Sequence, residues 1–232
     1  MSHADAPFRE KEAKKGKKSL PLWQETILLL AIALGLAIVI KMFLIQAFYI
    51  PSPSMEPQFV KNDRILVQKV SYWRGEPQRG DIIVFKDPGS WLPTTETGEP
   101  KSPVVKVLER VGLYPTGGHL VKRVIGVGGD RVICCDKQGR ITVNGTALDE
   151  KAYLPKGVQP SLTTFDVRVK QGYLWMMGDN RGDSWDSRGH MGDPGGGQVN
   201  TDLVVGKVFS LVWPWNRAEW ITRPKTFDAL DK

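Results

Sequence analysis

Cysteine and histidine are scarce in this chain of 232 residues, which contains two cysteines and three histidines. Cys134 and Cys135 are neighbours, so they cannot supply a framework of disulfides across a fold, and we expect either two packed thiols or one bond between them. His3, His119 and His190 lie far apart, and no spacing typical of metal ligands occurs. The sequence therefore predicts neither a metal centre nor a cofactor.

Long apolar runs are also scarce, and only residues 27–40 form one without a charged or polar side chain. The surrounding segment, 25–47, is long enough to cross a bilayer core of roughly 30 Å, which takes about 20 helical residues. A cleaved secretory signal is the alternative, but the run is longer than such a signal needs and no small-x-small site follows it. We therefore expect one uncleaved transmembrane anchor, with Lys41 reaching toward the lipid headgroups.

Acidic side chains are few before the anchor, where residues 1–24 carry six basic and three acidic side chains. This tail has no apolar periodicity, so it is predicted to be disordered, and its lysines favour a cytoplasmic location. Residues 48–232 then form an extracytoplasmic domain at the cell membrane. The net charge of +7 is a weak argument for nucleic acid, because its position matters more than its sum, and we expect no nucleic-acid partner.

Alternating and short apolar runs between turn residues predict that the rest of the chain is mostly β. Asn144-Gly145 predicts a tight turn, and residues 88–118 read as an inserted loop with a short helix at 103–113. Strands are predicted at 63–72, 80–87, 119–127, 130–136, 140–145, 166–179 (two strands) and 202–214. The expected fold is an antiparallel, β-rich domain with long loops, preceded by one N-terminal transmembrane helix.

Tryptophan is placed where a lipid surface would favour it. Trp23 stands at the start of the anchor, and Trp213, Trp215 and Trp220 cluster near the C-terminus. Indole rings favour the membrane interface, so we expect at least one of these residues to contact the bilayer. The alternative is that the last three close the core of the fold.

The segment "AFYIPSPSMEPQF", residues 47–59, follows the anchor directly. Pro53 fixes its own φ and Pro57 restricts Glu56, so Ser54 stands on a stiff turn. Such stiffness can hold a nucleophile ready for attack and lowers the entropy cost of reaction. The alternative is a plain linker between helix and domain, where proline and serine are common.

A serine nucleophile needs a base, and three side chains are candidates: His119, His190 and Lys122. Lys122 stands within the apolar strand "HLVKRVIGV", where alternation directs it and Arg123 to opposite faces. Burial would lower the pKa of a lysine, ordinarily about 10.4, by several units and make it a usable base. An edge-strand lysine with its amine in water is the alternative.

Four segments in this order, "IPSPSMEP", "GDIIVFK", "LVKRVIGVGGD" and "GDNRGDSWDSR", resemble bacterial type I signal peptidase, a membrane-anchored Ser/Lys endopeptidase. With the anchor they cover nearly the whole chain. The resemblance implies that Ser54 is the nucleophile and Lys122 the general base. It implies that Ser52 and the N–H of Ser54 form the oxyanion hole, and that Ser184 orients the lysine amine.

The same resemblance implies the substrate and its contacts. Secretory precursors would bind as an added β-strand, with small residues at −1 and −3 in shallow apolar pockets that exclude bulky side chains. The expected pocket lining is Phe48, Ile50, Met55, Leu120 and Val121. Asp179 with Arg123, and Asp186 with Arg188, match structural pairs that support the scaffold.

Two other functions remain open from the sequence. A Ser/Lys protease that cuts itself or a regulator, as in the SOS repressor family, shares the dyad, but the anchor and the lack of a helix-turn-helix motif argue against it. An anchored, β-rich binding module on the cell surface needs only the anchor and the strands. It leaves the combination of Ser52, Ser54, Lys122 and Ser184 unexplained.

Overall fold

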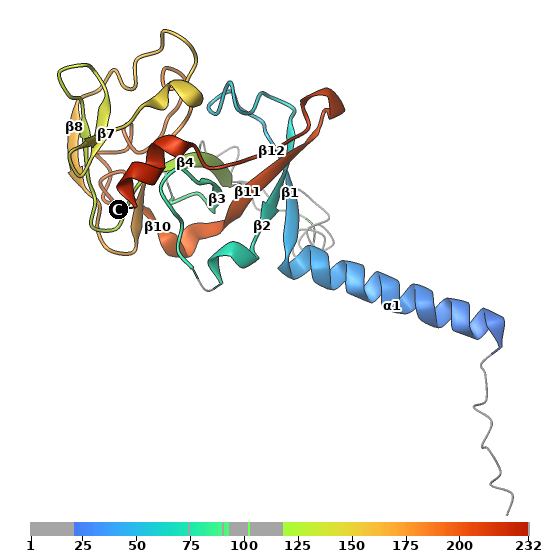
Figure 1. Cartoon of the computed structure of the whole chain (residues 1–232). Coiled ribbons are helices and arrows are strands. Elements are labelled where there is room, and N and C mark those ends of the chain that lie inside the picture. Colours follow the sequence, from blue (N-terminus) through green and yellow to red (C-terminus); the bar gives the residue numbers. More distant parts are fainter. Residues whose placement is uncertain (1–20, 74, 90, 93–101, 103–117, 232) are drawn as a thin grey trace, which may run out of the picture. The chain divides into compact units, whose positions relative to one another are not determined.

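The computed structural model describes residues 21–73, 75–89, 91–92, 102 and 118–231 (Figure 1). The helix predicted at 103–113 and the tail before residue 21 lie outside these residues. The chain divides into two compact units, residues 1–37 and 38–232.

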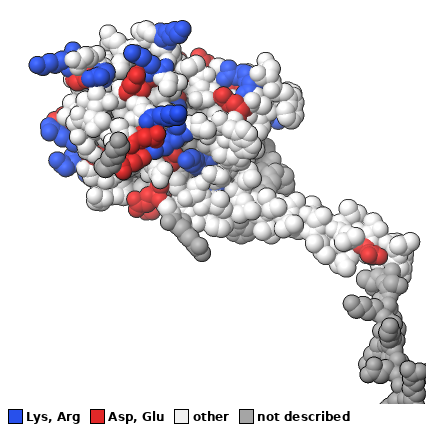
Figure 2. All heavy atoms as spheres, viewed as in Figure 1, with Lys and Arg blue, Asp and Glu red and all other residues white. Residues whose placement is uncertain are grey.

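Helix α1 (Leu22–Phe43) begins directly after a proline, whose carbonyl accepts hydrogen bonds from the N–H groups of Gln24 and Glu25. Over Leu22–Ile40 the mean hydropathy is 2.1 and none of this segment is buried, so its length and composition suit a membrane span. In Figure 2 the visible, described surface of this helix is almost free of charged side chains. Residues 45–47, which the sequence placed in the anchor, lie instead in the first strand, because their backbone pairs with a neighbouring strand.

The larger sheet has eight strands among the described residues, and its neighbouring strands are antiparallel (Figure 1). Its path runs through β1 (Ile45–Tyr49), β2 (Arg64–Gln68), β11 (Val204–Trp213), β3 (Ile82–Lys86), β4 (His119–Val127), β9 (Tyr173–Met177) and β10 (Val199–Asn200), while β12 (Glu219–Trp220) pairs with β11. The strand predicted at 119–127 has the bounds of β4. The one predicted at 63–72 ends at Gln68, where pairing with both neighbours ends.

The smaller sheet has four strands among the described residues, in the order β7 (Thr146–Ala147), β6 (Ile141–Val143), β5 (Arg131–Cys134) and β8 (Phe165–Arg168). The tight turn at Asn144-Gly145 is confirmed, since both residues have positive φ, 53° and 83°, as a two-residue hairpin loop requires. Cys134 and Cys135 are joined by a disulfide.

Short 3-10 helices complete the described fold: η1 (Val70–Tyr72), η2 (Glu150–Ala152), η3 (Thr201–Leu203), η4 (Trp215–Arg217) and η5 (Lys225–Leu230). Regular helix beyond α1 is otherwise replaced by strands and loops in the described residues. The prediction of a mostly β, antiparallel domain after one long apolar helix is therefore confirmed.

The larger sheet is curled, and the curl positions the candidate site. Strands β2, β11 and β3 separate β1 from β4 in the sheet, yet the rings of Phe48 on β1 and His119 on β4 have centroids only 5.4 Å apart. Register shifts in β11, and another in β4, accompany the curl. Such bulges bend a strand and increase its local twist, so β1 and the beginning of β4 can face each other.

Candidate active site

The proline-rich segment forms a closed loop between β1 and β2. The N–H of Ile50 donates to the carbonyl of Asp63 at 2.9 Å, and the N–H of Asn62 returns a bond of the same length to Ile50. Inside the loop, Met55 and Phe59 are buried in the apolar cluster that also contains β2 side chains. Ser54 precedes Met55 directly, so its backbone is attached to the core rather than to a free linker.

Ser54 and Lys122 meet although they are far apart in sequence. The Nζ atom of Lys122 lies 2.6 Å from the Oγ atom of Ser54, within hydrogen-bond distance. Only 9% of Ser54 and 4% of Lys122 is exposed to solvent. Lys122 extends from β4, opposite Ile83 of β3. The arrangement is that of a hydroxyl beside a dry amine.

Burial has a chemical consequence for this amine. Loss of solvent lowers the pKa of Lys122 from 10.5 to about 8, against the nearby Asp186 and Asp179 carboxylates, which favour the charged form. At pH 7 about one amine in ten is then neutral, against fewer than about one in a thousand at the ordinary pKa. The edge-strand alternative, with the lysine amine in water, is wrong, because Lys122 is buried.

The two described histidines have other surroundings. His190 contacts Asp193 through Nδ1 at 2.7 Å and stacks on Trp91, with ring centroids 4.4 Å apart. His119 lines the cavity beside Phe48. Among the three candidate bases, the described hydrogen bonds bring Lys122 to Ser54. In the described part of the chain, no three His, Cys, Asp or Glu side chains gather as a metal site would need.

The other two serines lie near the pair. The Oγ atom of Ser52 is 3.3 Å from that of Ser54. Ser184 donates its described hydrogen bond to Asp186, at 2.8 Å. A Cβ atom at Gly178 would collide with both the Ser184 hydroxyl and the Ser54 carbonyl, so these groups approach each other closely there. That Ser184 orients the lysine amine stays a prediction.

The two expected ion pairs are both formed. Arg123 donates to Asp179 through Nε and Nη2, at 2.8 and 2.6 Å, and both side chains are almost fully buried. Arg188 holds Asp186 in the same two-pronged way, at 2.9 and 2.8 Å. Burial of Asp186 opposes its charge, but the Arg188 guanidinium outweighs that effect and holds the pKa of the carboxyl below its usual value. That these pairs act as scaffold support stays a prediction.

A cavity of about 460 Å³ lies between β1 and the start of β4. Its lining includes Ser52, Ser54, Lys122 and all five side chains expected in the pockets: Phe48, Ile50, Met55, Leu120 and Val121. In the described residues β1 pairs with β2 alone, and β4 pairs with β9 only from Arg123 onward. These two strand edges, which have no strand partner among the described residues, border the cavity, and an extended peptide could add along such edges.

Sequence reasoning gave no role to several side chains at the site. Asn180 and Arg181 lie within the quoted motif "GDNRGDSWDSR", which was the signal for them. Glu150, in η2, hydrogen-bonds with Arg181 but lies outside the quoted motifs, and its spacing to other residues gave no indication of that contact.

Residues 23–213 match the family described as "Signal peptidase, peptidase S26". The matched span contains the cavity, both members of the Ser54 and Lys122 contact, and the two buried ion pairs.

Relatives with curated names cover most of the chain. It is 38% identical over 231 residues to the probable signal peptidase I of Mycobacterium leprae, covering 87% of this chain and 79% of that protein. It is 37% identical over 217 residues to the signal peptidase I of Mycobacterium tuberculosis, covering 84% and 74%. It is 32% identical over 223 residues to the probable signal peptidase I-2 of Synechocystis, covering 95% and 88%.

Proposed function

The chain belongs to the signal peptidase family, peptidase S26, and on that premise we propose that it cleaves N-terminal signal peptides from exported precursors with a Ser54 and Lys122 dyad. As a family member it is a serine endopeptidase. The observation that carries the proposal is the 2.6 Å contact between the Lys122 amine and the Ser54 hydroxyl, with both side chains buried.

The chemistry requires no cofactor. Neutral Lys122 accepts the Ser54 proton as Oγ attacks the scissile carbonyl, and the resulting ammonium then protonates the leaving amine. Ser52 and the N–H of Ser54 stabilise the tetrahedral oxyanion. Water, activated by the same lysine, next breaks the acyl–enzyme ester and regenerates the serine.

Specificity is proposed to come from the cavity beside the dyad. The precursor lies as an extended strand along the edges of β1 and β4 that border the cavity and places its −1 and −3 side chains against the apolar lining. The cavity walls include Phe48 and Val121, both half-buried. A wall of this kind selects small side chains by excluding larger ones.

The bilayer is the second proposed partner, with α1 as a single anchor and the domain on the extracytoplasmic side. The tryptophans near the C-terminus support this proposal, because Trp213, Trp215 and Trp220 are 45%, 75% and 74% exposed. The alternative that they close the core is therefore wrong. Exposed indoles favour the membrane interface.

The test uses the full chain in detergent or liposomes with two precursor peptides that differ only at −1, one ending Ala-x-Ala and one with a bulky residue there. We expect cleavage of the first alone, and none by Ser54→Ala or Lys122→Met. Lys156→Met, at an exposed lysine of the same domain, is the matched control. Cleavage by the Ser54→Ala protein would favour the anchored binding module, and self-cleavage without precursor cleavage would favour the repressor-type protease.

A further inference from the structure

Asn180 holds the backbone of the nucleophile turn at two successive carbonyl groups. Its N–H donates to the carbonyl of Ser54 at 3.1 Å, and its side-chain Nδ2 donates to the carbonyl of Pro53 at 3.2 Å. We call these two bonds the Asn180 clamp. They fix the carbonyls on both sides of the Ser54 Cα, so they fix the direction in which its side chain leaves the backbone.

The next residue, Arg181, is buried, and its guanidinium group makes four hydrogen bonds. Its Nε donates to the carbonyl of Gly178 at 2.9 Å, and its Nη1 donates to the carbonyl of Pro160 at 2.7 Å. Both terminal nitrogens also reach Glu150, the shorter contact being 2.6 Å to Oε1. Arg181 therefore ties the loop that carries Asn180 to η2, which lies in sequence between β7 and β8 of the smaller sheet.

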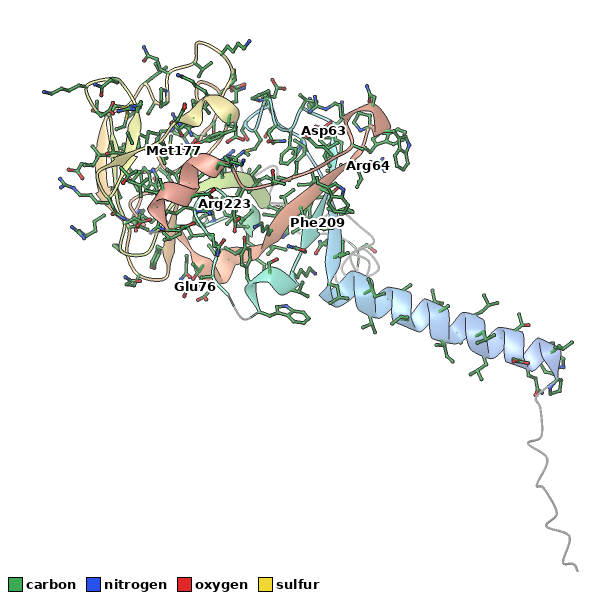
Figure 3. The ribbon with its side chains drawn as sticks, in the orientation of Figure 1. Asp63, Arg64, Glu76, Met177, Phe209 and Arg223 are labelled. Carbon is green, nitrogen blue, oxygen red and sulfur yellow. A yellow bond between two sulfur atoms is a disulfide. The ribbon has the colours of Figure 1, made fainter. Side chains whose placement is uncertain are left out.

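Glu150 is linked through Tyr153 to Arg123 of β4, the strand that carries Lys122. Tyr153 donates its hydroxyl to Glu150 at 2.6 Å, and its ring lies 4.3 Å from the guanidinium carbon of Arg123. Arg123 follows Lys122 on β4 and binds Asp179, the residue before Asn180. Met177, labelled in Figure 3, pairs with Arg123 across the two strands and leads into this loop. Asn180 thus stands in sequence between two buried charged residues, Asp179 and Arg181.

We propose that Asn180 is a positioning residue for Ser54, and that the buried Glu150 and Arg181 pair holds Asn180 in place. The inference rests on the proposed function, because it concerns the serine of that dyad. Its physical basis is that the Ser54 hydroxyl must meet both the lysine amine and the substrate carbonyl, and a shift of about 1 Å can cost on the order of 100-fold in rate. The segment between β7 and β8, which carries Glu150, then contributes to catalysis without touching substrate.

The first test removes the clamp donor alone. Asn180→Ala deletes the bond to Pro53, and Asn180→Asp replaces that donor with an acceptor facing a carbonyl. We expect kcat to fall about 10- to 100-fold in the alanine variant and further in the aspartate variant, with KM nearly unchanged. The lysine is untouched, so the midpoint of the alanine variant's pH–rate profile stays near that of the wild type.

The second test asks whether Glu150 acts through Asn180. Glu150→Gln keeps the shape of the side chain but removes its charge, and it is combined with Asn180→Ala in a double-mutant cycle. If the pair works by holding the clamp, kcat of the double variant falls little below that of the lower single variant. Asp166→Asn, which removes the solvent-exposed partner of Arg131 on the smaller sheet, is the matched control and keeps wild-type kcat.

Three results would overturn the inference: wild-type kcat in Asn180→Ala, a shifted pH midpoint in that variant, or multiplicative losses in the cycle. Thermal unfolding of each variant separates misplacement from unfolding, and Asn180→Ala alone remains decisive if Glu150→Gln does not fold. An inactive wild-type protein would count against the proposed function itself. An active wild type with an unaffected Asn180→Ala would sink only the positioning role.

Discussion

The ion pairs near the dyad and an ion pair on the smaller sheet differ sharply in their exposure to solvent. Around the dyad, Arg123 with Asp179 and Arg181 with Glu150 have side chains at most 3% exposed. On the smaller sheet, Arg131 with Asp166 uses the same two-pronged geometry, but its side chains are about half exposed, at 53% and 50%. Figure 2 shows mixed blue and red side chains across the visible face of the domain. The same arginine–carboxylate pair thus occurs both exposed to solvent and buried, and we call these wet and dry pairs.

This difference in exposure determines what each ion pair contributes to the protein. A solvated pair gains little, because water screens it and holding two long side chains in place costs entropy. A buried pair is no safer source of stability, since desolvation opposes it, but loss of one partner leaves an uncompensated charge in the interior. Arg123 follows Lys122 in sequence, and Asp179 and Arg181 stand on either side of Asn180, so we predict that the dry pairs fix the geometry of the dyad.

The largest loss of activity is expected when the nucleophile or its base is removed, because no other side chain can replace either group. Ser54→Ala and Lys122→Met should each lower kcat/KM for a precursor peptide by about 10⁴-fold or more, because the nucleophile or its base is absent. Lys122→Arg should be equally inactive, since a guanidinium stays protonated. Lys122→Met should unfold no earlier than the wild type, as it removes a buried amine. A cleavage rate near that of the wild type in Lys122→Met would contradict the dyad.

Breaking a dry pair should affect stability next most strongly. Asp179→Asn leaves Arg123 buried without its carboxylate, and we expect a loss of about 3–5 kcal/mol in the free energy of unfolding, measured with denaturant. The matched wet variant, Asp166→Asn, should keep the unfolding midpoint of the wild type. Equal losses in the two variants would mean that burial does not distinguish these pairs.

The pH dependence sharpens the same comparison at the lysine. Activity requires the neutral amine, whose pKa is lowered to about 8, so kcat/KM should rise about tenfold per unit below pH 8 and level off above it. Asp186 raises the pKa of Lys122 in the folded protein, so Asp186→Asn should move the midpoint to lower pH. A midpoint near 10.5, with a peptide that does not titrate in this range, would show a solvated lysine.

The smallest effect is expected in the cavity wall. Val121→Ala removes two methyl groups from the cavity wall, and we expect the preference for a small over a larger −1 or −3 residue to fall about tenfold. Competition between two precursor peptides measures this ratio directly. Leu162→Ala, at a leucine 80% exposed to solvent, is the control and should leave the ratio unchanged. An unchanged ratio in Val121→Ala would place the selective wall elsewhere.

Much of this molecule follows from local patterns, and the remainder depends on contacts between distant segments. The apolar run predicted α1, and the segment "HLVKRVIGV" predicted β4 with its exact range, because a helix of membrane-spanning composition and a buried strand both appear in the sequence as apolar runs. β1 was missed because its residues, "IQAFY", continue the apolar run and differ from it only in pairing with β2. The alternation of side chains along the strand did not decide whether Lys122 is buried, because its burial depends on how the sheet curls.

The residues of the site divide in the same way. Ser54 was predicted from the turn that its neighbouring prolines restrain, and Lys122 from its place in an apolar strand. The family resemblance supported both, and the structure brings the two side chains together. Glu150 was not found, because its partner Arg181 is 31 residues away and an acidic residue before a lysine reads as surface. Asn180 lay in a quoted motif, yet only the folded chain shows its donors at the carbonyls of Pro53 and Ser54.

One short connection has a practical consequence for anyone preparing the domain without its helix. Leu44 alone separates α1 from β1, and its carbonyl accepts a hydrogen bond from the N–H of Lys69 at 2.9 Å. A truncated form that starts beyond Leu44 would leave β1 as a frayed terminus held by a single neighbour. We therefore expect truncated proteins without this leucine to bind peptides more weakly than the intact enzyme does.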